Sequence, residues 1–254
     1  MAEPVCALCG GSGWKIVERE GVSGAERCEC AKESRAERLE AMAGIPPLYR
    51  NATFESFRIP KDNDIAARDL YAIRQTVLTY AHEFPAEPKP GLLLIGDTGT
   101  GKTHLAVAAL RSIIGKGFQG VFFDYQNLLD RIRSGFDPNS GSSDREAYRE
   151  ALEAEVLLVD DLGAHRVLPW IEDVVTAIIT HRCNHRQPLI ATTNLPDTVA
   201  GDRTTQKLPD GTLDYRRTLS DQIGARARSR LFEMCRLVHM PLVQDYRLRR
   251  TAAR

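Results

Sequence analysis

The sequence predicts an α/β protein whose core is a five-stranded parallel sheet between layers of helices. Two observations on residues 91–254 lead to this prediction. Short apolar segments alternate there with longer segments of helical periodicity, the pattern of a parallel sheet covered on both faces. Polar or glycine-rich motifs follow three of the apolar segments, and that is where such folds place ligand-binding residues.

The composition is that of an ordinary globular protein. The 254 residues are 43% hydrophobic and 27% charged, with 34 basic and 34 acidic side chains. This length allows one sizeable α/β core and a small accessory module. No run of 18 uncharged apolar residues occurs, and the N-terminus has no apolar leader. We therefore expect a cytoplasmic protein without a membrane span.

Three regions are expected along the chain. Residues 1–43 are predicted to form an N-terminal module and a helix, and residues 44–90 a linker and a second helix that lead into the core. Residues 91–254 form the main domain.

The two helices before the main domain are predicted from different features. The first is expected at 31–43 and ends at Gly44, a residue type that commonly terminates helices. The second is expected at 64–84, where apolar residues recur every three or four positions. Its apolar face consists of Ala66, Leu70, Ile73, Val77, Tyr80 and Phe84.

The main domain alternates strands and helices. Its strands are predicted at 92–95, 119–123, 155–160, 188–192 and 236–240. Its helices are predicted at 102–116, 126–134, 144–154, 170–185 and 220–233. Turn-forming residues at 137–143 and 201–218 predict two loops.

The first candidate site directly follows the strand at 92–95. The phosphate-loop motif G-x-x-x-x-G-K-[ST] is matched in full by Gly96, Asp97, Thr98, Gly99, Thr100, Gly101, Lys102 and Thr103. The glycines let backbone N–H groups approach phosphate, and the next helix N-terminus favours its charge. We expect the loop to bind ATP, with Lys102 on the β- and γ-phosphates and the Thr103 hydroxyl on Mg²⁺. Lys102 is expected to be solvated until phosphate arrives.

Two later strands end in polar residues that complete this candidate site. Asp160 is expected to hold Mg²⁺, directly or through water, as a Walker B residue does. Asp161 is placed to orient or deprotonate the attacking water. Asn194 ends the next strand, where its amide is a candidate contact for the γ-phosphate or that water, although Thr-Asn is also ordinary turn chemistry.

The N-terminal region contains a candidate metal site. Four of the six cysteines lie within the first 30 residues: Cys6, Cys9, Cys28 and Cys30. Their spacing is close to that of structural zinc sites, although the second pair has one intervening residue instead of two. A closed four-thiolate site would stabilise a segment that lacks apolar residues for a core. The alternative is four free thiols on a disordered tail.

These motifs, together with Arg226-x-x-Ser229-Arg230-Leu231, make the chain resemble the AAA+ ATPases. Within that class it is similar to the DnaC/DnaI-type helicase loaders and to the related IstB-like transposition ATPases. The resemblance covers residues 91–245. It implies an AAA+ P-loop NTPase core with a small N-terminal zinc-binding module. Little or no helical lid is expected, because only 14 residues follow the last predicted strand.

The resemblance also implies roles for individual residues. Arg230 matches the position of an arginine finger that acts on the ATP of a neighbouring subunit, and Arg226 lies one helical turn earlier on the same face. Self-association through the ATPase domain is therefore expected. AAA+ proteins usually have Glu where this chain has Asp161, which predicts slow hydrolysis.

The partners implied by the resemblance are those of a helicase loader. Residues 1–60 would bind the replicative DNA helicase, and the core would bind single-stranded DNA under ATP control. Two alternatives stay open, an IstB-like helper that acts on duplex DNA and a transposase, and a P-loop kinase of a small metabolite. Arg131 and Arg133 are candidate DNA contacts, with Tyr125 as a stacking partner. The alternative for these three is a basic helix face with a packed tyrosine.

Overall fold

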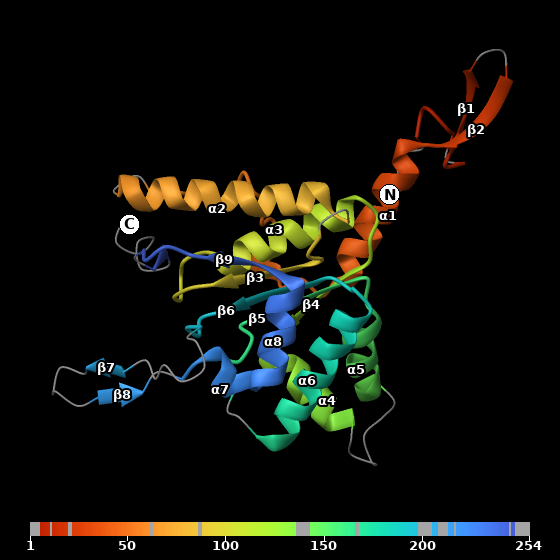
Figure 1. Cartoon of the computed structure of the whole chain (residues 1–254). Helices are drawn as coiled ribbons and strands as arrows, with labels where there is room; N and C mark the ends of the chain where they lie inside the picture. The colour runs from red at the N-terminus through yellow and green to blue at the C-terminus, as the bar shows by residue number, and fades with distance from the viewer. Residues whose placement is uncertain are drawn as a thin grey trace.

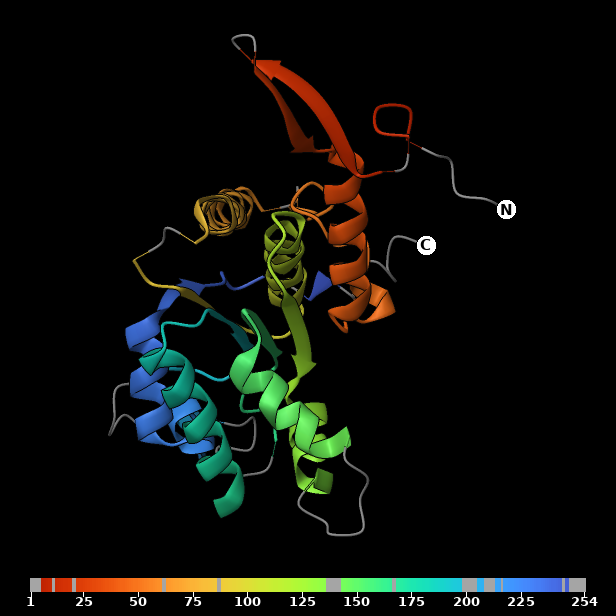
Figure 2. The ribbon, with the colours of Figure 1, turned by 90° about the vertical axis from the view of Figure 1, so that its right-hand side faces the viewer.

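The fold is built on one central parallel sheet with helices on both faces (Figures 1 and 2). In this computed structural model the sheet has five strands in the order β4-β5-β6-β3-β9. Its strands are β3 (Gly91–Ile95), β4 (Gly120–Asp124), β5 (Val156–Asp160), β6 (Leu189–Thr193) and β9 (Cys235–His239). All four pairings between neighbouring strands are parallel, so the predicted sheet is confirmed.

The description covers most of the chain. The structure describes residues 6–10, 12–19, 22–60, 63–85, 88–135, 143–165, 168–197, 205–207, 213–215, 217–243 and 245–246. Among these residues no helix is both long and apolar enough to cross a membrane.

The helices agree with the predicted ones except near the C-terminus. They are α1 (Glu29–Met42), α2 (Asp64–Glu83), α3 (Lys102–Gly115), α4 (Tyr125–Gly135), α5 (Ser143–Glu153), α6 (Pro169–Asn184), α7 (Leu219–Ile223) and α8 (Ala225–Met234), with a 3₁₀ turn η1 (Pro47–Tyr49). The single helix predicted at 220–233 is two helices. Gly224 separates them, because its φ of 83° and ψ of 150° are not helical.

Two apolar cores lie on opposite faces of the sheet. Strand residues alternate between them: Leu92 and Leu94 belong to one core, and Leu93 and Ile95 to the other. The first core is closed by α1, α2 and α3 and the second by α4 to α8, as Figure 1 shows. The predicted apolar face of α2 is confirmed, with Ala66, Leu70, Val77, Tyr80 and Phe84 buried and Ile73 partly buried.

The N-terminal region contains a hairpin that the sequence did not predict. Strands β1 (Trp14–Arg19) and β2 (Val22–Arg27) pair antiparallel and project from the N-terminal end of α1, away from the sheet (Figure 1). At its other end α1 reaches the outer side of β4, where the Phe122 N–H donates to the Ala43 carbonyl over 2.7 Å. An ion pair of 2.6 Å between Arg111 on α3 and Glu40 on α1 also holds the helix there.

Of the two predicted loops, one contains a hairpin. Within 201–218, β7 (Thr205–Lys207) and β8 (Leu213–Tyr215) pair antiparallel. The prediction of a loop throughout this range was therefore wrong. Apart from these strands and residues 217–218, that range lies outside the described residues. The predicted loop at 137–143 also lies outside them, except for Ser143, where α5 begins.

Candidate active site

The phosphate loop joins β3 to α3 with the backbone that its glycines allow. Gly99 and Gly101 have φ angles of 77° and 93°, which side chains other than glycine rarely adopt. A Cβ atom on Gly101 would lie 2.6 Å from the ring of Phe57, and one on Gly99 would lie 2.1 Å from the carboxyl group of Asp245. Both glycines are therefore required by close neighbours as well as by the turn itself.

Lys102, the first residue of α3, is held inside the loop. Its side chain is only 5% exposed, and its Nζ donates to the Asp97 carbonyl over 2.9 Å. The Thr100 hydroxyl donates to the same carbonyl over 2.8 Å. The expectation of a solvated lysine was therefore wrong, because its ammonium group is buried and hydrogen-bonded to a carbonyl of the loop. Phosphate oxygens have to replace this carbonyl when nucleotide binds.

Asp160 ends β5 beside the side chains of two threonines. The Thr192 hydroxyl on β6 donates to Asp160 Oδ1 over 2.6 Å, and the Thr103 side chain lies close enough to the carboxylate to lower its pKa. Burial raises the pKa of Asp160, and the nearby Asp161 carboxylate adds to the shift. A divalent cation would offset this buried charge, and carboxylate and hydroxyl oxygens are ligands that Mg²⁺ accepts. Thr103 and Asp160 therefore fit the predicted magnesium site.

Asp161 and Asn194 lie at the carboxyl ends of neighbouring strands. Asp161 has a φ of 54°, a left-handed conformation that Asp tolerates better than most residues, and its N–H donates to the Thr192 hydroxyl over 2.9 Å. Asn194 is exposed and directly follows β6. The Gly96 N–H donates to the Thr193 carbonyl over 3.2 Å, which connects the phosphate loop to the residue before Asn194.

Sequence reasoning missed two residues of this site. Thr192 was given no role, although its hydroxyl bonds to both the Asp160 carboxylate and the Asp161 N–H. A hydroxyl residue in an apolar strand, level with the acids of the next strand, is the pattern that could have identified it. Asp245 follows β9, and its side chain packs on Gly99, while the Tyr246 N–H donates to the Gly99 carbonyl over 3.2 Å. Nothing in the local sequence around Asp245 indicates this contact.

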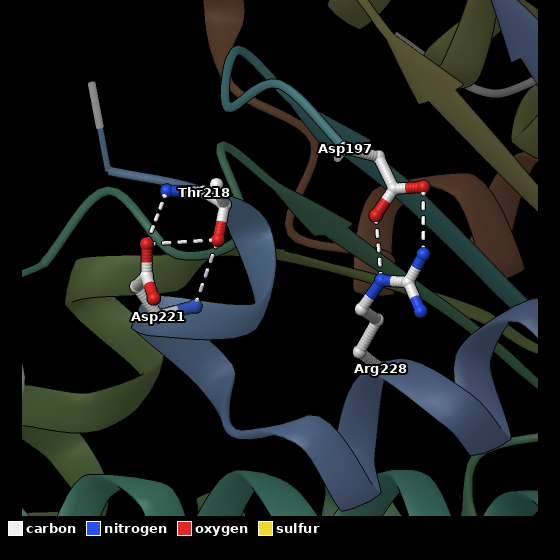
Figure 3. A network of polar contacts seen from close by, with 4 residues as sticks. All are labelled: Asp197, Thr218, Asp221 and Arg228. Atoms are coloured by element: carbon white, nitrogen blue, oxygen red, sulfur yellow. Dashed lines mark hydrogen bonds and ion pairs between the residues drawn. The ribbon is translucent and has the colours of Figure 1, made fainter. Parts of the chain in front are cut away.

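The two predicted finger residues lie on α8. Arg226 is exposed, and Arg230 donates to Glu233 over 2.8 Å, with side chains that are 43% and 58% exposed. Such an exposed pair contributes little to stability, so Arg230 can exchange Glu233 for another anion at small cost. Between these two arginines, Arg228 makes a two-pronged ion pair with Asp197, which sequence reasoning did not predict (Figure 3).

The predicted DNA contacts are only partly available. Tyr125 is 2% exposed and its burial raises its pKa, so the prediction of a base-stacking tyrosine was wrong. Its ring packs in the core beneath α4. The Arg131 guanidinium lies 5.3 Å from the centre of the Phe123 ring, and Arg133 is exposed.

The four N-terminal cysteines converge as a metal site requires. All four sulfurs lie within 4.8 Å of one another, with Cys6 and Cys28 at 3.8 Å and Cys9 and Cys30 at 3.4 Å. Tetrahedral zinc with Zn–S bonds of about 2.3 Å separates its sulfurs by about 3.8 Å. The backbone N–H groups of Leu8 and Cys9 lower the pKa of Cys6, whereas the neighbouring thiols of Cys9 and Cys28 raise the pKa of Cys30, so metal has to displace the Cys30 proton. The donor set therefore fits a structural zinc ion.

The parallel sheet, the phosphate loop before a helix and the buried acid beside the loop threonine define the chain as a P-loop ATPase of the AAA+ class. The family follows from comparison with known proteins. The family model described as "IstB-like ATP binding protein" matches residues 25–213, and the chain belongs to this family.

Individual relatives are more distant. The chain is 24% identical over 218 residues to the uncharacterized protein YqaM of Bacillus subtilis, covering 83% of this chain and 61% of the relative. It is 25% identical over 166 residues to the replicative helicase loader DnaC of Escherichia coli, covering 64% of each chain. Less than two thirds of either relative is therefore spanned. Among solved structures, a crystal structure of the DnaC helicase loader superimposes with a TM-score of 0.60 at 28% identity, covering 77% of this chain and 100% of that one.

Proposed function

We propose that this protein is an ATP-controlled helicase loader, which binds the replicative DNA helicase through its N-terminal region and single-stranded DNA through its ATPase core. The observation that carries the proposal is the arrangement of two units on one chain. A nucleotide site lies at the carboxyl edge of the sheet. A cysteine module, made of the four N-terminal cysteines and the hairpin β1–β2, projects from the N-terminal end of α1 (Figure 2). The similarity to DnaC, itself described as a replicative helicase loader, supports it.

The cysteine module suits an adaptor. On the hairpin, the side chains of Trp14 and Ile16 are 52% and 82% exposed, and Leu8 beside it is 74% exposed. A two-stranded hairpin has no core of its own in which to bury such residues. Their apolar surface is therefore available to a partner, while zinc bound by Cys6, Cys9, Cys28 and Cys30 would keep the module folded.

The experiment that tests this function is co-purification. The tagged full-length protein is expected to retain the replicative helicase from a host lysate, and Ile16→Ser is expected to weaken that capture without loss of ATP binding. The matched control is Ile65→Ser, since Ile65 is 77% exposed but lies on α2, outside residues 1–60. Capture of a transposase together with a preference for duplex DNA would instead assign the protein as an IstB-like transposition helper.

Hydrolysis in the proposed loader is slow and is completed between subunits. Asp161 is one methylene shorter than the glutamate usual in AAA+ proteins, so it reaches less far toward the attacking water. Arg230, supported by Arg226 one turn earlier, would reach the γ-phosphate of the ATP held by a neighbouring subunit. A guanidinium suits this task because its charge is permanent and its fork matches phosphate oxygens. Such a finger contributes about 10³–10⁵ in rate.

A further inference from the structure

A continuous chain of polar contacts leads from the magnesium site into the loop after β6. The Thr192 hydroxyl bonds to Asp160 Oδ1 and accepts from the Asp161 N–H. Its neighbour Thr193 donates from Oγ1 to the Leu162 carbonyl over 2.9 Å and accepts from the Leu195 N–H over 3.2 Å. The position of residues 194–197 is therefore set by the same two strands that hold the candidate catalytic acids.

That loop is in turn attached to α7 and α8. The Leu219 N–H donates to the Pro196 carbonyl over 3.1 Å, and the start of α7 is fixed by a reciprocal capping box between Thr218 and Asp221 (Figure 3). The Arg228 guanidinium on α8 donates from Nε to Asp197 Oδ1 over 2.5 Å and from Nη2 to Asp197 Oδ2 over 2.9 Å. Figure 3 shows the two side chains facing each other across the gap between the loop and the helix.

The Arg228–Asp197 pair is more confined than an ordinary surface ion pair. The two side chains are only 23% and 13% exposed, and the Arg228 guanidinium also lies 4.4 Å from the centre of the Phe232 ring. A two-pronged contact of this kind fixes orientation as well as distance. Arg228 is therefore an anchor of α8, in contrast to Arg230, whose pair with Glu233 is exposed.

Helical geometry relates this anchor to the two candidate fingers. Arg226 and Arg230 lie two residues before and two residues after Arg228, and two residues correspond to about 200° of rotation around an α-helix. When Arg228 points at its own loop, the other two arginines must point to the opposite side of α8. The anchor thus sets the rotation of the helix and with it the direction in which the fingers point.

We propose that Arg228 is a positioning residue. Its bidentate ion pair with Asp197 orients α8 so that Arg226 and Arg230 point toward the ATP of the neighbouring subunit. This inference rests on the proposed completion of hydrolysis between subunits. It assigns Arg228 no contact with nucleotide, so its effect has to appear in the subunit that donates the finger and not in the subunit that holds the ATP.

The test measures ATP turnover in mixed assemblies of full-length chains. Lys102→Ala subunits lack a working pocket but keep their arginines, and Arg230→Ala subunits keep a working pocket but lack the finger. Each is inactive alone, and mixing them is expected to restore turnover. Arg228→Ala is then added to one partner at a time.

The two arms are expected to differ. In the Lys102→Ala donor, Arg228→Ala should lower the restored turnover about tenfold or more, since a misplacement of about 1 Å can cost about 10²-fold in rate. In the Arg230→Ala partner the same change should have little effect, because that helix already presents no finger. Arg228→Lys in the donor should give an intermediate loss, because lysine keeps the charge but not the fork.

Asp197→Asn supplies an independent check on the donor side. It should produce a similar loss, and its combination with Arg228→Ala should add little, since both changes remove one contact. The control is Arg149→Ala, which removes exposed pairs with Glu146 and Glu153 on α5 and is expected to leave turnover unchanged. Melting curves and nucleotide binding show that each donor is folded.

The outcomes separate the inference from the function on which it rests. Equal losses in both arms, or no loss in the donor arm, would overturn the positioning role while completion between subunits stands. No recovery in the parent mixture of Lys102→Ala and Arg230→Ala, with assembly confirmed by light scattering, would overturn both.

Discussion

At the scale of single residues, Asp160 is a buried acid whose ionised form a bound cation would stabilise. Its side chain is 7% exposed, and burial raises its pKa, so the ionised carboxylate destabilises the folded protein unless positive charge compensates it. The Thr192 and Thr103 hydroxyl groups offset only part of that penalty. The role proposed for this residue therefore opposes stability, as is common at active sites.

Asp160→Asn is accordingly expected to raise the melting temperature of the nucleotide-free protein and to abolish Mg²⁺-dependent turnover while ATP still binds. A carboxyl whose pKa is raised by folding destabilises the protein at pH values above that pKa, and the penalty disappears as the pH falls through it. The gain from the substitution should therefore be largest near pH 8 and shrink in acid. Scanning calorimetry from pH 4 to 8 measures it, with the exposed Asp130→Asn as control. A lower melting temperature at pH 8 would contradict the role of Asp160.

The residues of the phosphate loop could be predicted because the motif is local: every member lies within eight consecutive positions. Asp160 could be predicted as well, because an acid that ends a buried strand has to lie at the ligand edge of the sheet. The bonds of Lys102 to Asp97, Thr192 to Asp160 and Arg228 to Asp197 could not. They depend on which rotamer a side chain selects or on which strands are neighbours, and neither is encoded in local spacing.

At the scale of elements, Arg182 fastens α6 to the parts of the chain around it. The side chain is fully buried, and its guanidinium donates to the carbonyls of Ala151, Leu152, Ala154 and Pro188 at 2.6–3.3 Å. Three of these carbonyls end α5 or directly follow it, and the fourth precedes β6. Burial lowers the pKa of Arg182 to about 10, so the group stays charged at neutral pH.

Arg182→Met is therefore expected to be strongly destabilising. It fills much of the same volume but removes a donor from all four carbonyls. The Pro188 carbonyl keeps the Leu157 N–H at 3.2 Å, and each buried group left unsatisfied costs about 1–3 kcal/mol. We expect a loss of roughly 3 kcal/mol or more in the free energy of unfolding, measured by urea denaturation. Arg149→Met, on the exposed side of α5, is the control and should change stability little. A change of similar size in both variants would mean that the carbonyl contacts of Arg182 do not matter.

The N-terminal module is the element whose folding we expect to depend on metal. Purified without chelator, the protein is expected to contain one zinc per chain, which Cys6→Ser or Cys28→Ser should remove. Zinc binding at such sites contributes about 10 kcal/mol near neutral pH, enough to fold a hairpin without a core. Cys183→Ser is the matched control, because Cys183 packs against the main core and should leave zinc in place. Elemental analysis with less than about a tenth of an equivalent would reject the zinc site.

At the scale of the whole molecule, the nucleotide site and the candidate DNA surface share the sheet. Asp124, at the end of β4, pairs in register with Asp160 on β5, and α4, which carries Arg131 and Arg133, begins at the next residue. A shift of β5 on binding Mg²⁺ and ATP can therefore reach α4 directly. If ATP favours one arrangement of these elements, it changes the free energy of DNA binding. DNA then changes the free energy of ATP binding by the same amount.

The full-length protein is thus expected to bind single-stranded DNA more tightly with ATP than with ADP. Arg133→Ala should weaken binding to all sequences alike and reduce the salt dependence of affinity by about 0.7 in log–log slope, the value for one phosphate contact on a single strand. Arg149→Ala serves again as control. Fluorescence anisotropy at several salt concentrations measures both effects, and identical affinities with ATP and ADP would contradict control by nucleotide.

The fold as a whole could be predicted at the level of layers but not of order. Five apolar segments alternating with helices predict a covered parallel sheet, and the structure confirms it. That β6 lies between β5 and β3, and that β9 closes the edge beside β3, depends on long-range packing that periodicity does not report. The hairpin β1–β2 was not predicted because Trp14 and Ile16 are exposed, so burial imposes no periodic pattern on these large apolar residues.

The contact between the end of α1 and the first strand of the sheet has a consequence for solubility. β4 is an edge strand, and edge strands offer unpaired backbone groups that recruit other chains. Its sequence, Gly-Val-Phe-Phe-Asp, is apolar, aromatic and prone to cross-β association. The Ala43 carbonyl accepts a hydrogen bond from the Phe122 N–H there, and α1 lies alongside β4. Residues 29–43 thus act as a guard against aggregation, and an ATPase core trimmed at residue 44 should precipitate where the full chain does not.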